Sequence, residues 1–323
     1  MTKMLFATAP DGTRLPVLDI THPAFAVPES DADIAALGAA ALKEEESRGP
    51  VQRLLMGFFM RRLARTSRIL AALQAANEGY LSGIATYVMK LGPDNVVPPY
   101  DSPIDKRVLQ TPIVTGMRVR LHQTAWLLAD ALAPELTGNA RPLVLLEIAG
   151  GPSADALNAL LLLEQRGLLA GRRSQIVVYD IDSDGPAFAA SLLAALQDGP
   201  LAGREIVLRH TIGDWSDRAA LSAVLAELPA DAVLAATSEG GLFEYGSDED
   251  IAAVLTVLAP RVGIVTGSVT RDDRLIQLMR RVSAPLTVPR GLQRFGHVIA
   301  RTGYRVERSR PSPLSDQVLL TRS

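Results

Sequence analysis

The chain has 323 residues, which is enough for one or two domains with a large core. Its 33 basic and 35 acidic residues nearly balance, so no basic excess favours a nucleic-acid partner, and the absence of cysteine excludes disulfides, thiolate metal sites and a cysteine nucleophile. The first residues lack the apolar core of a signal peptide, and no uncharged apolar run approaches a membrane span. We therefore expect a cytoplasmic protein with no membrane partner.

Residues 1–110 are predicted to form a short hairpin followed by a mainly helical lid. "KMLFATAPDGTRLPVLDI" contains two β-like runs around a Pro-Asp-Gly turn. A Ser/Asp N-cap opens a helix over residues 30–46, and the apolar stripe of residues 51–91 predicts helix interrupted near Gly79. A loop rich in proline and aspartate follows at 92–107.

Residues 111–323 are predicted to form an α/β domain that begins with a helix over 116–136. From Arg141 the chain alternates between β-rich runs and helices, which predicts parallel strands joined by right-handed crossovers. Two further β-like runs at the end are separated by about five residues and should form a hairpin. The expected fold is a doubly wound, mostly parallel, seven-stranded sheet with an antiparallel C-terminal strand. Its strands are predicted at 143–149, 175–181, 205–212, 232–238, 261–267, 304–310 and 316–322, and the helices between the first five at Ser153–Gly167, Gly185–Gln197, Trp215–Leu228 and Asp248–Leu258.

The turn after the first of these strands carries the strongest functional pattern. Glu147 is followed by Ala149-Gly150-Gly151-Pro152-Ser153 and then by a helix. Small residues let the backbone approach a ligand at such a strand–helix turn. Asp180 ends the second strand, where a carboxylate can accept hydrogen bonds from both hydroxyls of a ribose. Asp214 follows the third strand, where its side chain can reach an adenine edge.

From about Arg141 to Ser323, the order and spacing of these residues resemble the class I S-adenosylmethionine (SAM) dependent methyltransferase family. That family's first motif runs acidic-x-Gly-x-Gly-x-Gly, and Glu147, Ala149, Gly151 and Ser153 occupy its places. Small residues thus replace two of the three glycines. A nicotinamide-binding Rossmann domain is the competing interpretation, but its G-x-G-x-x-G pattern is absent.

The resemblance implies SAM as the bound cofactor. Glu147 would orient the turn or accept from the SAM ammonium, and Gly151 would let the methionine part lie against the backbone. Asp180 would hold the ribose. The other residues expected to bind SAM are Gly150 in the turn, Ile181 and Trp215 against the adenine ring, Asp214 at the adenine amino group, and Arg118 at the methionine carboxylate.

Candidate catalytic residues follow the fourth strand, in "ATSEGGLFEYGSDED". In an open α/β sheet, reactive groups lie outside the carboxyl ends of the strands. The segment resembles the one that lines the donor sulfur in small-molecule methyltransferases, which implies Ser238 and Glu239 as catalytic residues. Tyr87 of the lid is a third candidate, since an aromatic ring can face a sulfonium. The four histidines are scattered, so we expect no metal site.

The expected protein is an enzyme that transfers a methyl group from SAM to a small-molecule acceptor. A second hypothesis is that the SAM amine attacks its own γ-carbon, releasing methylthioadenosine and azetidine-2-carboxylate, as in the methyltransferase-like azetidine synthases. A third is a non-catalytic partner protein of the same fold. The expected partner is a small-molecule substrate, not a nucleic acid, and a homodimer stays open.

Overall fold

A seven-stranded sheet forms the centre of the molecule in a computed structural model, which describes residues 3–49, 62–75, 81–280 and 287–323. The strand order is β5-β4-β3-β6-β7-β9-β8. β9 is antiparallel to β7 and β8, and the other neighbours are parallel, which confirms the predicted sheet. The strands are β3 (Leu143–Ile148), β4 (Ser174–Asp180), β5 (Ile206–Ile212), β6 (Val233–Ser238), β7 (Ile264–Thr270), β8 (Tyr304–Pro311) and β9 (Ser315–Arg322).

The chain changes direction across the sheet beside β3. It moves outward from β3 through β4 to β5, and then returns to place β6 on the other side of β3. Ligands of open α/β sheets bind outside the carboxyl ends of the strands at such a reversal. The ends of β3 and β6 therefore mark where a ligand site is expected.

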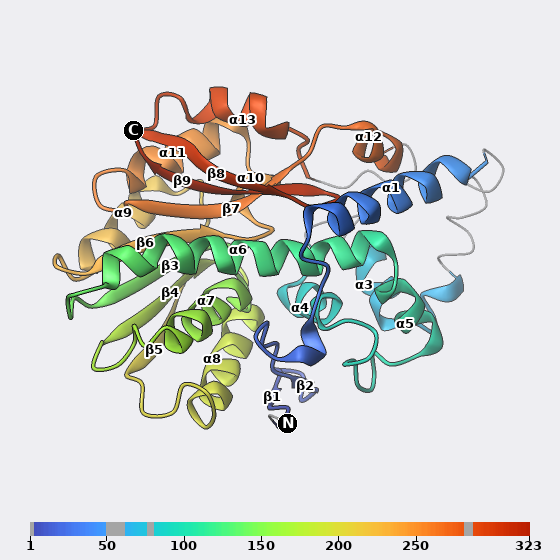
Figure 1. Ribbon diagram of the computed structural model, residues 1–323, viewed down its shortest axis with the longest axis horizontal. Helices are drawn as coiled ribbons and strands as arrows, with labels where there is room; N and C mark the ends of the chain where they lie inside the picture. Colours follow the sequence, from blue (N-terminus) through green and yellow to red (C-terminus); the bar gives the residue numbers. More distant parts are fainter. Residues whose placement is uncertain (1–2, 50–61, 76–80, 281–286) are drawn as a thin grey trace.

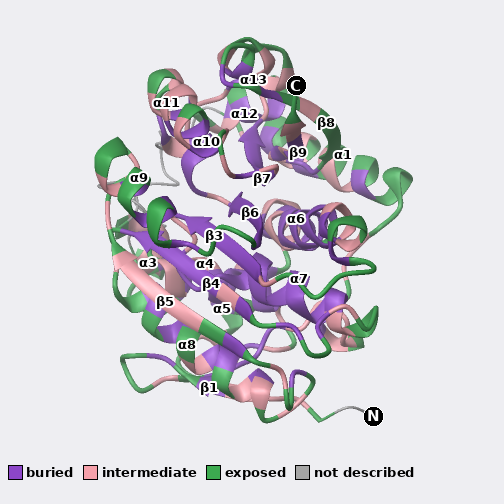
Figure 2. Cartoon of the chain, turned by 90° about the vertical axis from the view of Figure 1, so that its left-hand side faces the viewer, coloured by how far each residue is buried: buried purple, intermediate pink, exposed green. Residues whose placement is uncertain are grey.

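Helices cover both faces of the sheet (Figures 1 and 2). Alternate side chains of each central strand enter two separate hydrophobic clusters, as the two-residue period of a strand requires. One face is covered by α6 (Pro112–Leu136), α7 (Ala154–Gln165) and α8 (Asp184–Gln197), and the other by α9 (Arg218–Glu227), α11 (Asp248–Leu258) and α13 (Gly291–Ile299). Two shorter helices, α10 (Leu242–Tyr245) and α12 (Arg274–Arg280), lie between these elements in the chain.

The N-terminal part contains the predicted hairpin, β1 (Phe6–Thr8) and β2 (Arg14–Pro16), and then mostly helices. Ser30 caps α1 (Asp31–Ser47) by accepting from the Asp33 N–H, as predicted. The side chains of this part share one hydrophobic cluster with the sheet, so the boundary at residue 110 stays a prediction. The other elements are the 3-10 turn η1 (Pro23–Phe25), α3 (Arg68–Ala75), α4 (Gly83–Leu91) and α5 (Pro103–Leu109).

Proline explains why two helices begin earlier than the sequence predicted. α5 lies partly in the segment expected to be a loop, where Ser102 is its N-cap and Pro103 its first residue. α6 begins at Pro112, four residues before the expected start, with Thr111 as its N-cap. Proline suits the first turn of a helix because that position needs no N–H partner. The break expected near Gly79 lies outside the described residues.

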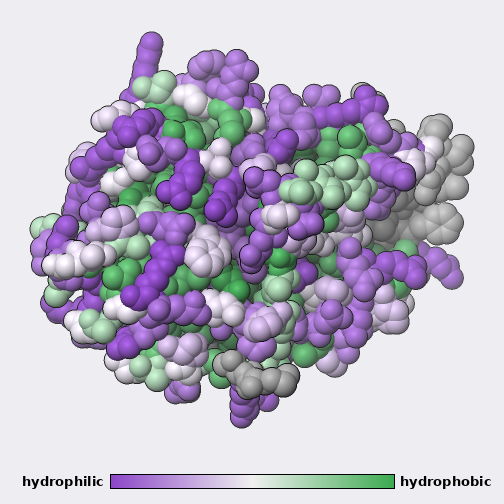
Figure 3. Space-filling model, viewed as in Figure 1, coloured by the Kyte–Doolittle hydropathy of each residue, from purple (hydrophilic) through white to green (hydrophobic). Residues whose placement is uncertain are grey.

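The face of the molecule in Figure 3 carries mainly hydrophilic side chains, with hydrophobic ones visible between them. Among the described residues, no helix combines the length and the apolar character needed to cross a bilayer.

Candidate ligand site at the carboxyl ends of β3 and β6

The turn after β3 keeps a left-handed backbone at all three motif positions. φ is 53° at Ala149, 47° at Gly151 and 53° at Ser153. Glycine adopts this conformation freely, whereas other residues lose about 1–2 kcal/mol in it. The two residues that replace glycine in the sequence motif therefore keep the backbone shape that glycine would give.

Asp180, at the end of β4, closes this turn. Its Oδ2 accepts from the Gly151 N–H at 2.8 Å, and its Oδ1 accepts from the Asp182 N–H at 2.8 Å. Burial raises the pKa of this carboxyl, while the two backbone donors oppose that shift. Each carboxylate oxygen can accept a second hydrogen bond, so Asp180 keeps capacity for ribose hydroxyls. Its place beside the turn suits the ribose role, which stays a prediction.

The glycines of this region allow backbones to pack closely. A Cβ on Gly185, at the start of α8, would lie 2.8 Å from the Gly151 Cα, and a Cβ on Gly83, at the start of α4, would lie 2.9 Å from the Pro152 Cδ. A Cβ on Gly150 would overlap the Glu147 carboxylate. Two helix N-termini thus meet on the turn, a packing role for these glycines that sequence reasoning missed.

The outer part of the site lies at the ends of β4 and β5. Ile181 follows β4 and Ile212 ends the edge strand β5, and their side chains are 68% and 71% exposed, which is high for large apolar residues. Asp214 is exposed, and its Oδ1 accepts from the Ser216 N–H at 2.7 Å, which forms a local turn. Trp215 is partly buried and packs against the hydrophobic cluster on the sheet face that α9, α11 and α13 cover. Exposed apolar side chains close to a carboxylate suit an aromatic base with a polar edge.

A buried ionic cluster joins α4 and α6 to the end of β6. Glu239 binds Lys90 of α4 and Arg120 of α6, and Arg120 also donates to Glu244 at 3.1 Å. Burial raises the pKa of the Glu239 carboxyl, but the neighbouring Arg120 and Lys90 lower it by more. The pKa therefore lies below its usual value, and the carboxylate is held ionised. A carboxylate bound by two cations is a weak base, and in this structure Glu239 fixes α4 and α6 to the end of β6. Its catalytic role stays a prediction.

Ser238 and Tyr87 are also committed to structural hydrogen bonds. Ser238 Oγ donates to the Ile148 carbonyl at 2.7 Å and accepts from the Leu242 N–H at 2.8 Å, which fastens the end of β6 to that of β3. The Tyr87 hydroxyl donates to the Pro16 carbonyl at 2.9 Å and accepts from the Leu18 N–H at 2.7 Å. Both hydroxyls thus hold structural hydrogen bonds, and their catalytic roles stay predictions.

Arg118 contacts the segment before α1 and the residue that follows α4, and its role at the methionine carboxylate stays a prediction. It donates to the Ala26 carbonyl at 2.9 Å, and its guanidinium lies beside Gly92. The arginine that reaches the site is Arg120, which is 7% exposed and follows two residues later on α6. Arg118 and Arg120 both stand between apolar residues in "MRVRL", so the sequence carries no signal that tells the buried arginine from the other.

Glu147 and Asp155 form a buried acidic pair next to the ionic cluster around Glu239. Glu147 is 0% exposed, and among the described residues neither of its oxygens makes a hydrogen bond of ordinary length and angle. Asp155, in the first turn of α7, accepts from the Thr237 Oγ1 at 2.5 Å. Burial raises the pKa of both carboxyls, and the Asp155 charge raises that of Glu147 further. Glu147 is thus fully buried, with the Asp155 carboxyl and the Ala156 backbone as its hydrogen-bonding neighbours, at the point where the resemblance expects a ligand.

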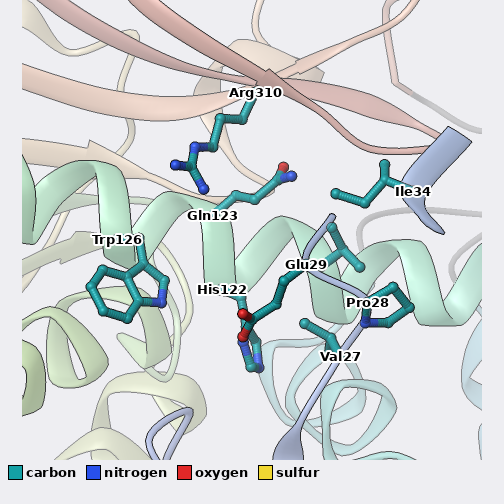
Figure 4. A pocket seen from close by; sticks show the side chains of 9 residues that line it. Val27, Pro28, Glu29, Ile34, His122, Gln123, Trp126 and Arg310 are labelled. Carbon is teal, nitrogen blue, oxygen red and sulfur yellow. The ribbon is translucent and has the colours of Figure 1, made fainter. Parts of the chain in front are cut away.

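A separate cavity of about 110 Å³ lies on the outer face of α6 (Figure 4). None of the residues that line it lies at the carboxyl ends of β3 or β6, so it is not part of the candidate site. Its lining comprises Val27, Pro28, Glu29, Ile34, Val119, His122, Gln123, Trp126 and Arg310. In the described part of the chain, no group of three or more acidic or histidine side chains is placed to hold a metal ion.

No protein-family model matches the chain, and no curated protein matches it. Among solved structures, magnesium protoporphyrin IX methyltransferase from Synechocystis PCC 6803 is 15% identical over 65% of this chain and 87% of its own, with a TM-score of 0.46. N,N-8-amino-8-demethyl-D-riboflavin dimethyltransferase from Streptomyces davawensis is 14% identical over 99% and 81%, with a TM-score of 0.41. An O-methyltransferase from neocarzinostatin biosynthesis, solved with S-adenosyl-L-homocysteine and 1,4-dihydroxy-2-naphthoic acid, is 16% identical over 99% and 81%, with a TM-score of 0.40. These are distant similarities, and the function proposed below rests on the site instead.

Proposed function

We propose that this protein is a SAM-dependent methyltransferase that acts on a small-molecule acceptor. The turn after β3 carries the proposal. It has the spacing of the methyltransferase motif, a left-handed backbone at all three motif positions, and a carboxylate from the end of the next strand bound to its centre. This turn stands where the strand order reverses, which is where an open α/β sheet binds its ligand.

The residues present fit SAM. Asp180 has acceptor capacity left for the ribose, and the exposed Ile181 and Ile212 offer apolar surface to the adenine. Glu147, buried beside the turn, is retained as the candidate partner of the SAM ammonium. Asp214 and Trp215 are retained as candidates for the adenine edge and face, with Gly150 and Gly151 in the turn below.

The bound cofactor supplies a methyl group already activated on a sulfonium, so little acid–base chemistry is asked of the protein. The chain positions the acceptor and excludes water, two effects that can account for most of the rate. α4 and the Lys90–Glu239–Arg120 cluster would serve this role because they close over the strand ends. The near-balanced charge supports a small-molecule substrate rather than nucleic acid, and we place the protein in the cytoplasm.

The test is to titrate the purified protein with SAM by calorimetry and to identify the products by mass spectrometry. S-adenosylhomocysteine that forms only when an acceptor is added supports methyl transfer. Methylthioadenosine formed without an acceptor replaces the proposal with cyclisation, and binding with neither product indicates a non-catalytic protein. Failure of the folded protein to bind SAM contradicts the proposal.

A matched pair of variants tests the site itself. Asp180→Ala removes an acceptor of charge-assisted bonds worth about 1.5–3 kcal/mol each, so SAM affinity should fall more than tenfold. Asp198→Ala removes an exposed carboxylate at the far end of α8 and should leave affinity unchanged. Equal affinity in the two variants would remove Asp180 from the binding site.

A further inference from the structure

The cavity on the outer face of α6 is built from three parts of the chain that are far apart in the sequence. Its lining comes from residues 27–34, from α6 and from β8 (Figure 4). Its volume is about 110 Å³. A cavity of about 150 Å³ can hold one benzene molecule, so this cavity suits an apolar group of about four carbon atoms with polar ends at its rim.

The buried part of the lining is apolar apart from one amide and one imidazole. Ile34 and Val119 are buried there, and Gln123 beside them is 6% exposed. Gln123 Nε2 donates to the Pro311 carbonyl at 3.0 Å, whereas its Oε1 has no hydrogen-bond partner among the described residues. A buried acceptor without a partner is rare in folded proteins, and a donor on a ligand would satisfy it.

The rim of the cavity carries one negative and one positive side chain, Glu29 and Arg310. Both residues are exposed, and neither side chain makes a hydrogen bond or an ion pair with the part of the chain that the structure describes. Figure 4 shows the Arg310 guanidinium on the Trp126 side of the cavity and the Glu29 carboxylate on the His122 side. Burial lowers the pKa of His122 to about 4, so its imidazole adds no charge at neutral pH. Opposite charges around one small cavity suit a ligand that carries both signs.

We propose that this cavity binds a small zwitterion with an apolar side chain, of the chemical class of the apolar α-amino acids. Glu29 and the Gln123 Oε1 accept from the ammonium, and Arg310 donates to the carboxylate. The apolar side chain of the ligand fills the space beside Ile34 and Val119. The cavity is separate from the carboxyl ends of β3 and β6, so the inference does not depend on the proposed function.

Trp126 supplies the readout, because it lines the cavity and is 38% exposed. The chain has two tryptophans, and Trp215→Phe removes the one in the candidate SAM site. L-leucine added to this variant should shift the Trp126 emission to shorter wavelength in a saturable way, because the ligand displaces water from the ring. An amino acid bound at the SAM site instead would leave this emission unchanged.

Three matched ligands separate the parts of the proposed contact. Isocaproate lacks the ammonium of leucine and should bind about tenfold more weakly, because the buried Gln123 Oε1 stays unpaired. Isopentylamine lacks the carboxylate and should bind about threefold more weakly, because only an exposed ion pair is lost. Glycine should bind about a hundredfold more weakly, because the whole apolar side chain is lost.

Two variants in the same background test the residues. Gln123→Met removes the acceptor and keeps the length of the side chain, so the affinity for leucine should fall about tenfold. Because this change also removes the bond to Pro311, Arg310→Gln on the exposed rim is the second variant and should lower the affinity about threefold. Arg305→Gln is its matched control, since Arg305 lies on the same strand, pairs with Glu307 and is not part of the lining.

A saturable shift that the analogues and both variants weaken, and that the control does not, supports the inference. Absence of a saturable shift in the folded protein overturns it. Equal affinity for leucine and isocaproate, or equal affinity in both variants and the control, also overturns it. Each of these results leaves the proposed function standing, and failure to bind SAM would leave this inference standing.

Discussion

Replacing Ser153 by glycine should stabilise the protein. Ser153 precedes α7 with φ at 53°, and it is fully buried. A serine N-cap ordinarily has extended backbone and accepts from the first turn of its helix, but here the side chain makes no capping bond. Among the described residues its Oγ has no hydrogen-bond partner at all. Serine at this position therefore carries a left-handed backbone and a buried unpaired hydroxyl, and it does not cap the helix.

The expected size follows from four effects. Relief of the left-handed conformation contributes about 1–2 kcal/mol, and removal of a buried unpaired hydroxyl about 1–3 kcal/mol. Greater freedom of glycine in the unfolded chain costs about 0.5–1 kcal/mol, and the lost packing costs about 1 kcal/mol. The net gain is about 1–2 kcal/mol, which should raise Tm by about 2–4 °C.

Thermal unfolding of Ser153→Gly beside Ala156→Gly provides the assay. Ala156 lies three residues further on, in the helical part of α7, and is equally buried. Glycine there should lose about 1 kcal/mol or more, because helix propensity and a packed methyl are both lost. If Ser153→Gly lowers Tm as the control does, the reasoning from left-handed strain is refuted. SAM affinity should stay close to that of the wild type, since the turn keeps its shape.

Three further outcomes follow from the lid and its anchors. Glu239→Gln should cost about 3–5 kcal/mol of stability because it leaves two buried cations short of a charge, whereas neutralising Glu227 of the exposed Arg209 pair should cost under about 1 kcal/mol. Because the folded pKa of Glu239 is depressed, its contribution is present above the unfolded pKa of about 4.3 and is lost as pH falls through the folded value; acid titration of Tm should show this loss in the wild type and not in the variant. Tyr87→Phe should cost about 1–3 kcal/mol in urea unfolding and leave kcat unchanged, since its hydroxyl serves only the core. SAM should slow hydrogen exchange in residues 81–101, and equal exchange with and without SAM would show that this segment does not close over the ligand.

The secondary structure of the α/β part could be predicted closely from the sequence. The run at 143–149 became β3, Leu143–Ile148, and the two final runs became the β8–β9 hairpin. β3 is buried on both faces, so it reads as a continuous apolar run between polar turns. α10 was missed because it has only four residues and begins after Gly241, too short for a helical period to show.

The site could be predicted only where it depends on positions close to strand ends. Glu147 and Asp180 lie beside the turn because parallel strands carry their last residues to the same edge. Side chains that meet through tertiary packing were not predicted. Lys90 and Glu239 are 149 residues apart, and Arg120 and Glu239 are 119 apart. Their pairing depends on how α4 and α6 lie on the sheet, and hydrophobic periodicity carries no information about that.

The two ends of α4 are fixed to the two strands between which a ligand is expected. At its start, Gly83 packs on the turn after β3, and near its end, Lys90 binds the carboxylate that follows β6. α4 thus contacts the ends of two neighbouring strands, β3 and β6, at the point where the strand order reverses.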